Sequence, residues 1–154
     1  MKAQNKEVEQ EQLSLWGLIK KLEAVKDKAL PLLIDCTNNL PMSLDSWRGS
    51  YSDLSIQTES MGSYLLDSAT YKYKEIGCVN PNVEQWLSVL NEAVGKTFTW
   101  YKGWEFVMTK STFLWLAEYR NSWFKIVDDV YEQVFFVDVL ETETEVILIT
   151  QIQY

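Results

Sequence analysis

From Lys96 to the C-terminus the chain is rich in aromatic and β-branched residues, which favour β-strands, and polar pairs interrupt them at short intervals. The interruptions fall at 110–111, 120–121, 128–129 and 141–143. They delimit predicted strands over 104–108, 113–119, 123–128, 132–139 and 144–152, of which the last is apolar enough for a central position. Because short connections join neighbouring antiparallel strands, the pattern predicts an antiparallel meander.

Two amphipathic helices precede this region. Apolar residues recur between Leu15 and Val25 at intervals of three and four, which predicts a helix over residues 12–26. A second apolar stripe follows Asn80 and Pro81, which suit a cap and a first helical turn. Gly95 stands where a left-handed residue would end that helix, so a helix is predicted over 81–94.

The remaining segments are shorter. Residues 32–34 predict a buried strand, and residues 41–57 predict a loop that returns into a strand over 53–57. Residues 1–12 are polar and expected to be flexible, and 59–80 predict a short helix or an irregular insertion. Together these elements predict one α+β domain, with two amphipathic helices packed on one face of an antiparallel sheet.

Charge narrows the possible functions. The 154 residues contain 22 acidic and 14 basic side chains and no histidine, so the net charge is −8. An acidic balance argues against a direct nucleic-acid-binding surface and against docking on an anionic membrane. The absence of histidine removes the usual general base and the commonest metal ligand. We therefore expect no catalytic residues, no metal and no cofactor, and a protein that is not an enzyme.

The cysteines and the hydropathy pattern indicate a compartment. Cys36 and Cys78 match no metal-ligand spacing, and the N-terminus lacks the apolar stretch of a signal peptide. No apolar run is long enough for a transmembrane helix. The expectation is a cytoplasmic protein with both thiols free.

Two segments resemble a family of small, uncharacterised bacteriophage accessory proteins. The first is DSWRGSYSDL at 45–54, similar to a family pattern D-S-[YW]-R-G-x-Y-x-x-L. The second is GKTFTWYKGWEFVM at 95–108, where the family has G-Y-K-G-G-[ED]-[FY]-x-M, followed by a T-x-x-W-[VL]-A pattern at 112–117. The similarity spans about residues 13–119, with 59–80 as an insertion. Trp100 and Trp104 stand where the family pattern has glycines.

The resemblance implies an origin rather than a reaction. It indicates an accessory protein made in the cytoplasm of a bacterial host. Small acidic phage proteins of this kind often block host defence nucleases, and the resemblance therefore favours a host protein as partner.

The two motif segments share the order aromatic, basic, glycine. A cation beside aromatic rings and exposed backbone amides suits a phosphate or carboxylate, and ring faces suit a nucleobase. If the segments meet, they predict a small pocket for an anionic nucleotide. The alternative is structural, with Arg48 paired to Asp45 or Asp53 and the rings acting as anchors. The candidate binding residues are Asp45, Trp47, Arg48, Tyr51, Tyr101, Lys102 and Trp104.

Nearly all of the excess negative charge lies in residues 126–154, which hold seven acids and no lysine or arginine. The acids are Asp128, Asp129, Glu132, Asp138, Glu141, Glu143 and Glu145. They predict either a solvated, solubilising surface or one that imitates DNA or docks on a basic groove of a nucleic-acid-binding protein. In a strand, the last three would alternate onto one face at intervals of about 6.5–7 Å.

Seven tryptophans exceed what a small core usually needs. Trp16, Trp86 and Trp115 fall on apolar stripes and are predicted to be buried. Trp47, Trp100, Trp104 and Trp123 lie near predicted loops and are candidates for an interface, including one between copies of this chain.

These observations lead to three hypotheses. The first is a phage accessory protein that binds, and inhibits, a host defence protein through an acidic and aromatic surface. The second is a protein that sequesters an anionic nucleotide through Arg48, Lys102 and the nearby rings. The third is a structural phage protein with no role in defence.

Overall fold

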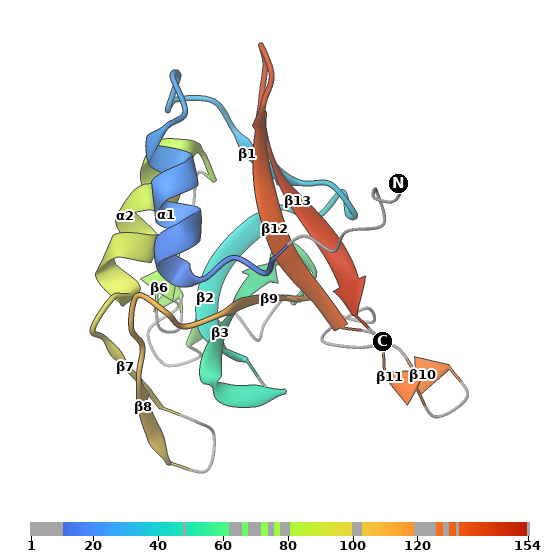
Figure 1. Cartoon of the computed structure of the whole chain (residues 1–154). Coiled ribbons are helices and arrows are strands. Elements are labelled where there is room, and N and C mark those ends of the chain that lie inside the picture. Colours follow the sequence, from blue (N-terminus) through green and yellow to red (C-terminus); the bar gives the residue numbers. More distant parts are fainter. Residues whose placement is uncertain are drawn as a thin grey trace.

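The computed structural model describes residues 11–47, 49–61, 66–67, 72–73, 76–77, 81–99, 103–118, 126–127, 130–131 and 133–153. A seven-stranded sheet, ordered β1-β13-β12-β9-β3-β2-β6, forms its centre. The strands are β1 Leu32–Ile34, β2 Pro41–Trp47, β3 Ser50–Thr58, β6 Ile76–Gly77, β9 Leu114–Ala117, β12 Gln133–Glu141 and β13 Val146–Gln153. Helices α1, Leu15–Glu23, and α2, Val83–Ala93, lie together on one side of the sheet (Figure 1).

Three two-stranded ladders accompany the main sheet. They pair β4 Leu66–Asp67 with β5 Lys72–Tyr73, β7 Thr97–Thr99 with β8 Glu105–Val107, and β10 Ile126–Val127 with β11 Val130–Tyr131. The α+β class is therefore confirmed. None of the described helices is both long and apolar enough to cross a bilayer.

The prediction of a purely antiparallel meander is wrong, because the sheet is mixed. β1 runs parallel to β13, and β3 runs parallel to β9. Of the neighbours expected from short connections, β12 and β13 do form an antiparallel hairpin. The strand expected at 104–108 becomes β8, which pairs with β7 outside the main sheet. Short connections therefore did not determine which strands pair. β9 is buried on both faces, and it pairs with β3 on one side and β12 on the other, although neither is joined to it by a short connection.

Of the prediction for 41–57, the strand over 53–57 is confirmed as part of β3, but the loop before it is wrong. Residues 41–47 and 50–58 form the antiparallel hairpin β2–β3, with Leu44 opposite Ile56. Within 59–80, predicted as an insertion, β6 pairs with β2 at the edge of the sheet. In the same span, residues 59–61 form a 3₁₀ turn, and β4 pairs with β5. The other residues of 62–80, residues 1–10 of the segment predicted to be flexible, and most of the strand at 123–128 lie outside the described residues.

The helices begin at residues that cap them. The Ser14 side chain accepts a hydrogen bond from the Gly17 amide at 3.1 Å, and α1 is shorter than predicted. Asn82 accepts from the Gln85 amide at 2.8 Å, so Asn82 rather than Asn80 caps α2. The helix ends as predicted, with Gly95 at a φ of 82° after the C-cap Val94.

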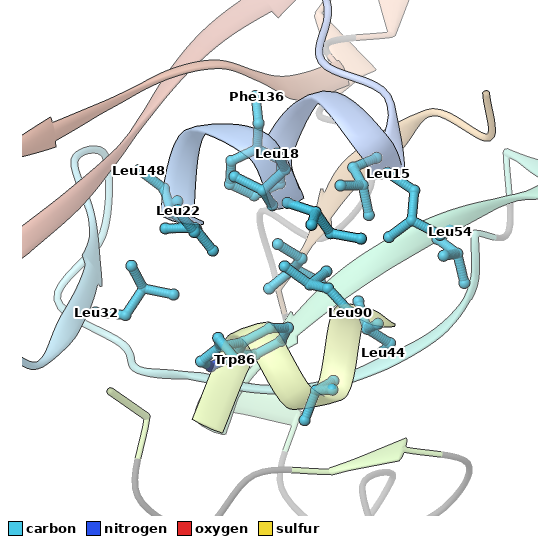
Figure 2. Close-up of a cluster of buried hydrophobic side chains, with 14 of the residues drawn as sticks. Leu15, Leu18, Leu22, Leu32, Leu44, Leu54, Trp86, Leu90, Phe136 and Leu148 are labelled. Atoms are coloured by element: carbon cyan, nitrogen blue, oxygen red, sulfur yellow. The ribbon is translucent and has the colours of Figure 1, made fainter. Parts of the chain in front are cut away.

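The main core lies between the two helices and the sheet (Figure 2). Fully buried leucines of α1, α2, β1, β2, β3 and β13 meet there with Trp86 and Phe136. The Trp86 indole also donates a hydrogen bond to the Pro41 carbonyl at 3.2 Å, which ties α2 to the start of β2. Trp86 and Trp115 are buried as predicted.

Trp16 is only partly buried, contrary to the prediction. The Lys20 and Lys110 ammonium groups lie 4.2 and 4.1 Å from its ring centroid. The indole therefore sits at the edge of the core, where its apolar ring packs inward and its face attracts cations.

Gly95 also opens the hairpin formed by β7 and β8, which we call the arm. Its amide donates to the Met108 carbonyl at 2.8 Å, while the Met108 amide donates to the Lys96 carbonyl at 2.9 Å. Two residues thus face one, which is the geometry of a G1-type β-bulge with glycine in the left-handed region. The bulge bends and twists the chain, and the arm extends away from the helices and sheet (Figure 1).

We expect Gly95→Ala to lower the free energy of unfolding by about 1–2 kcal/mol, because an alanine resists the left-handed conformation. A Cβ there would meet nothing within 4 Å, so the cost is purely conformational. Gly17→Ala makes the same chemical change inside α1, where it should stabilise by about 0.5–1 kcal/mol. Urea denaturation of both variants measures the two changes, and a shift of the same sign in both would contradict this account.

Candidate functional site

The face of the sheet turned away from the helices carries an aromatic cluster. Trp47 of β2 stacks on Trp115 of β9, with ring centroids 4.0 Å apart and planes within 5°. Phe135 of β12 meets Trp115 edge-on at 5.9 Å and 73°. Val137 and Ile149 complete the aromatic cluster. These side chains come from strands far apart in the sequence, and the sheet alone brings them together.

Gly49 explains why the first motif contains a glycine. A Cβ at this position would lie 2.4–2.6 Å from three atoms of the six-membered ring of Trp47. The indole therefore folds over the hairpin turn, and only glycine leaves room for it. Trp47 is 3% exposed, so the prediction of an interface role for this ring is wrong. The Trp47 ring stacks on Trp115 and is buried, so no face of it is open to a nucleobase.

Asp53 lies beside the same aromatic cluster. The Trp115 indole donates a hydrogen bond to its carboxylate at 3.1 Å. Burial raises the pKa of Asp53, while the hydrogen bond from Trp115 acts in the opposite direction. The carboxylate thus anchors an indole, and sequence analysis had considered it only as a partner for Arg48.

The structure describes only some of the other candidate binding residues of the two motifs. The Asp45 carboxylate accepts from the Ser46 amide at 2.7 Å, and Tyr51 is half-buried on β3. Trp104 is 65% exposed on the arm. Arg48, Tyr101 and Lys102 lie outside the described residues, as do Trp100 and Trp123. The anion pocket and the pairing of Arg48 with Asp45 or Asp53 stay predictions.

A buried polar cluster at the end of β9 was not predicted. Glu118 is 3% exposed, and its Oε1 accepts hydrogen bonds from Thr37 and Asn39 at 2.5 Å. Thr58 donates to the same atom at 3.4 Å. Glu118 thereby joins the turn after β1 to the end of β3. The one signal in the sequence was an acid directly after the apolar run of 113–117.

Four of the seven acids, Asp138, Glu141, Glu143 and Glu145, lie in β12 or in the turn between β12 and β13. β12 ends at Glu141 and β13 begins at Val146, so Glu143 and Glu145 lie in a turn. The prediction that three glutamates alternate along one strand face is therefore wrong. The structure does not describe the side chains of Asp128, Asp129 and Glu132.

Two of the acids have structural partners. Asp138 forms an ion pair with Lys21 at 3.0 Å, and its carboxylate accepts from the Val139 amide at 2.8 Å. These contacts lower the pKa of Asp138, the backbone hydrogen bond most. Glu141 accepts from the amides of Lys26 and Asp27 at 3.1 and 3.3 Å, which holds the chain after α1. The carboxylates of Asp138 and Glu141 thus stabilise the fold through an ion pair and hydrogen bonds to backbone amides.

Exposed apolar side chains occur on the arm, where Val107 is 60% and Trp104 65% exposed. The tip of the β12–β13 hairpin, which carries Glu143, lies at the opposite end of the molecule from the arm (Figure 1). Among the described residues, the exposed apolar side chains of the arm and the acid at this hairpin tip therefore lie apart. Among the described residues no group of three or more cysteines and carboxylates could hold a metal. Cys36 is an exposed free thiol.

No family model, curated protein or solved structure matches this chain.

We expect Gly49→Ala to destabilise the protein by about 1–3 kcal/mol, because the new methyl group overlaps the Trp47 ring. A double-mutant cycle with Trp47→Leu isolates the contact. Trp47→Leu alone costs stability, but on that background Gly49→Ala should have a much smaller effect. Denaturant titration measures all four proteins. An equal cost of Gly49→Ala on both backgrounds would show that the ring is not the obstacle.

Asp53 and Asp138 should change stability with pH in opposite directions. The raised pKa of Asp53 means that the native state holds a proton that the unfolded state has lost, so its contribution falls as pH rises above about 3.9. The pKa of Asp138 is lowered in the native state, so its carboxylate stabilises the fold above about pH 3.9. This stabilisation is lost as the pH falls below that value and the carboxylate takes up a proton.

We therefore expect the stability difference between wild type and Asp53→Asn to shift against wild type with rising pH. The difference for Asp138→Asn should shift in favour of wild type over the same range. Unfolding measured between pH 3 and 7 tests both, and curves of the same slope would contradict the assigned environments.

Proposed function

We propose that this chain is a phage accessory protein that acts by binding a host protein, and that the arm carries the contact. The observation that carries the proposal is that the arm holds two large exposed apolar side chains, Trp104 at 65% and Val107 at 60%. Tryptophan is the residue most enriched among the energetic hot spots of protein interfaces. An exposed pair of this size on a projecting element favours a partner protein.

The base of the arm supports this use. Phe98 and Met108 are fully buried, and Phe106 packs partly against the main core. The inward face of the arm therefore anchors it, while Thr97, Thr99, Glu105 and Val107 face solvent. An anchored hairpin loses little conformational entropy on binding, which favours affinity.

The charge of the protein suits a basic partner. A net charge of −8 attracts a positively charged protein over long range and repels nucleic acid. With the resemblance to phage accessory proteins, this favours a host nucleic-acid-binding protein, such as a defence nuclease, as the target of inhibition. The absence of histidine supports binding rather than catalysis. The nucleotide-binding alternative gains nothing from the buried, stacked Trp47.

Affinity capture from a bacterial host lysate, with the full chain as bait, tests the proposal. We expect a stoichiometric protein partner on wild type that Trp104→Ala loses. With the purified partner, Trp104→Ala should weaken binding by about 30-fold or more, the range of a hot-spot tryptophan. Because Trp104 lies outside both buried clusters, the melting temperature should change little.

The matched control is Glu143→Gln, an exposed position at the opposite end of the molecule. It removes a charge but no apolar contact, and its affinity should stay within about twofold of wild type. A lysate that yields no protein partner, or a partner that Trp104→Ala binds as tightly as wild type, would overturn the proposal.

A further inference from the structure

The main sheet has one weak seam, between β9 and β12. The described residues of these strands share a single register pair, Phe135 with Trp115. On either side the ladders are longer: β12 and β13 share eight pairs, and β3 and β9 share four. The sheet thus consists of two well-paired parts, β1-β13-β12 and β9-β3-β2-β6, joined at one position.

Residues just before α1 take the place of the next pair at this seam. In antiparallel register Leu114 and Phe136 would face each other after Trp115 and Phe135. Instead, the Phe136 carbonyl accepts from the Leu13 amide at 2.7 Å, and the Leu114 carbonyl accepts from the Gln12 side-chain amide at 3.0 Å. Ser14 forms an antiparallel bridge with Phe113. We call residues 12–14 the strap.

A bulge in β12 lies at the same point. The register of β12 against β13 shifts between Phe136 and Asp138, so Val137 has no counterpart. A bulge bends its strand and increases its twist, which carries β12 away from β9. In Figure 1 β12 and β13 accordingly rise away from the part of the sheet that contains β9, β3 and β2. The strap fills the divergence that the bulge creates.

We infer that the strap is a conformational device: it holds the two parts of the sheet together, and its displacement separates β9 from β12 while both parts stay folded. The distribution of hydrogen bonds indicates that the seam between β9 and β12 opens before the ladders on either side of it. Displacing the strap removes the two bonds of Gln12 and Leu13 and leaves one pair to hold the seam. The ladders on either side keep all of theirs, and local opening follows the weakest set of contacts.

The seam also passes through the aromatic cluster. Its only pair joins Trp115 and Phe135, which belong to the two different parts of the sheet. Opening the seam would therefore part Phe135 from the Trp47–Trp115 stack and expose apolar surface that is now buried.

Hydrogen exchange on the full chain tests the inference. Leu13→Pro removes the amide that donates to Phe136, and Gln12→Ala removes the side chain that donates to Leu114. In each variant, amides of β9 and of residues 134–137 should exchange about five- to tenfold faster, the equivalent of one lost hydrogen bond. Amides of β2 and of residues 146–149 should exchange at the wild-type rate.

Ser14→Ala is the matched control, since it removes the cap bond to Gly17 but leaves both strap bonds in place. It should speed exchange in α1 without a selective effect at the seam. If Leu13→Pro does not fold, Gln12→Ala, a side-chain change, decides the question. Faster exchange spread evenly over all strands, or no change in β9 and residues 134–137, would overturn the inference.

Discussion

The burial of β9 on both faces is the constraint on which the rest of the structure depends. Leu114 and Leu116 point into the core beneath the helices, while Trp115 joins the aromatic cluster on the opposite face. A strand of this kind is most stable with a strand on each side, because its backbone and both rows of side chains are then shielded from water. β3 meets this need on one side with a parallel ladder, and β12 meets it on the other with a single pair and the strap.

The same constraint gives the sequence motifs a structural meaning. Trp47 must reach across β3 to stack on Trp115, and the hairpin can accept that only with glycine at position 49. Asp53 then holds the Trp115 indole from the neighbouring strand. The segment that looked like a loop for an anion thus builds the packing of a sheet face. The arm takes no part in the main sheet and carries Trp104, the most exposed tryptophan among the described residues.

The two helices, the C-terminal end of the second and most strand positions after residue 104 could be predicted, since each depends on neighbours within a few residues. Gly95 is the clearest case, because a helix end and a left-handed residue follow from one local pattern. The pairing of β9 with β3 could not be predicted. β3 lies about 60 residues earlier in the chain, and no local sequence pattern indicates which distant strand a parallel partner will be. The Glu118 cluster could not be predicted for a similar reason, because its donors come from the turn after β1 and from β3, which only the fold brings near.

By itself, the sequence determined the class of the fold, the two amphipathic helices, the acidic C-terminal region and the improbability of histidine-based catalysis. Only the tertiary structure decided which of the described tryptophans are buried, which acids form hydrogen bonds or ion pairs within the chain, and that the arm and the tip of the β12–β13 hairpin lie at opposite ends. The physical reason is the range of the interactions. Propensity and capping act over one or two turns, whereas burial and strand pairing depend on segments that meet only once the sheet has formed.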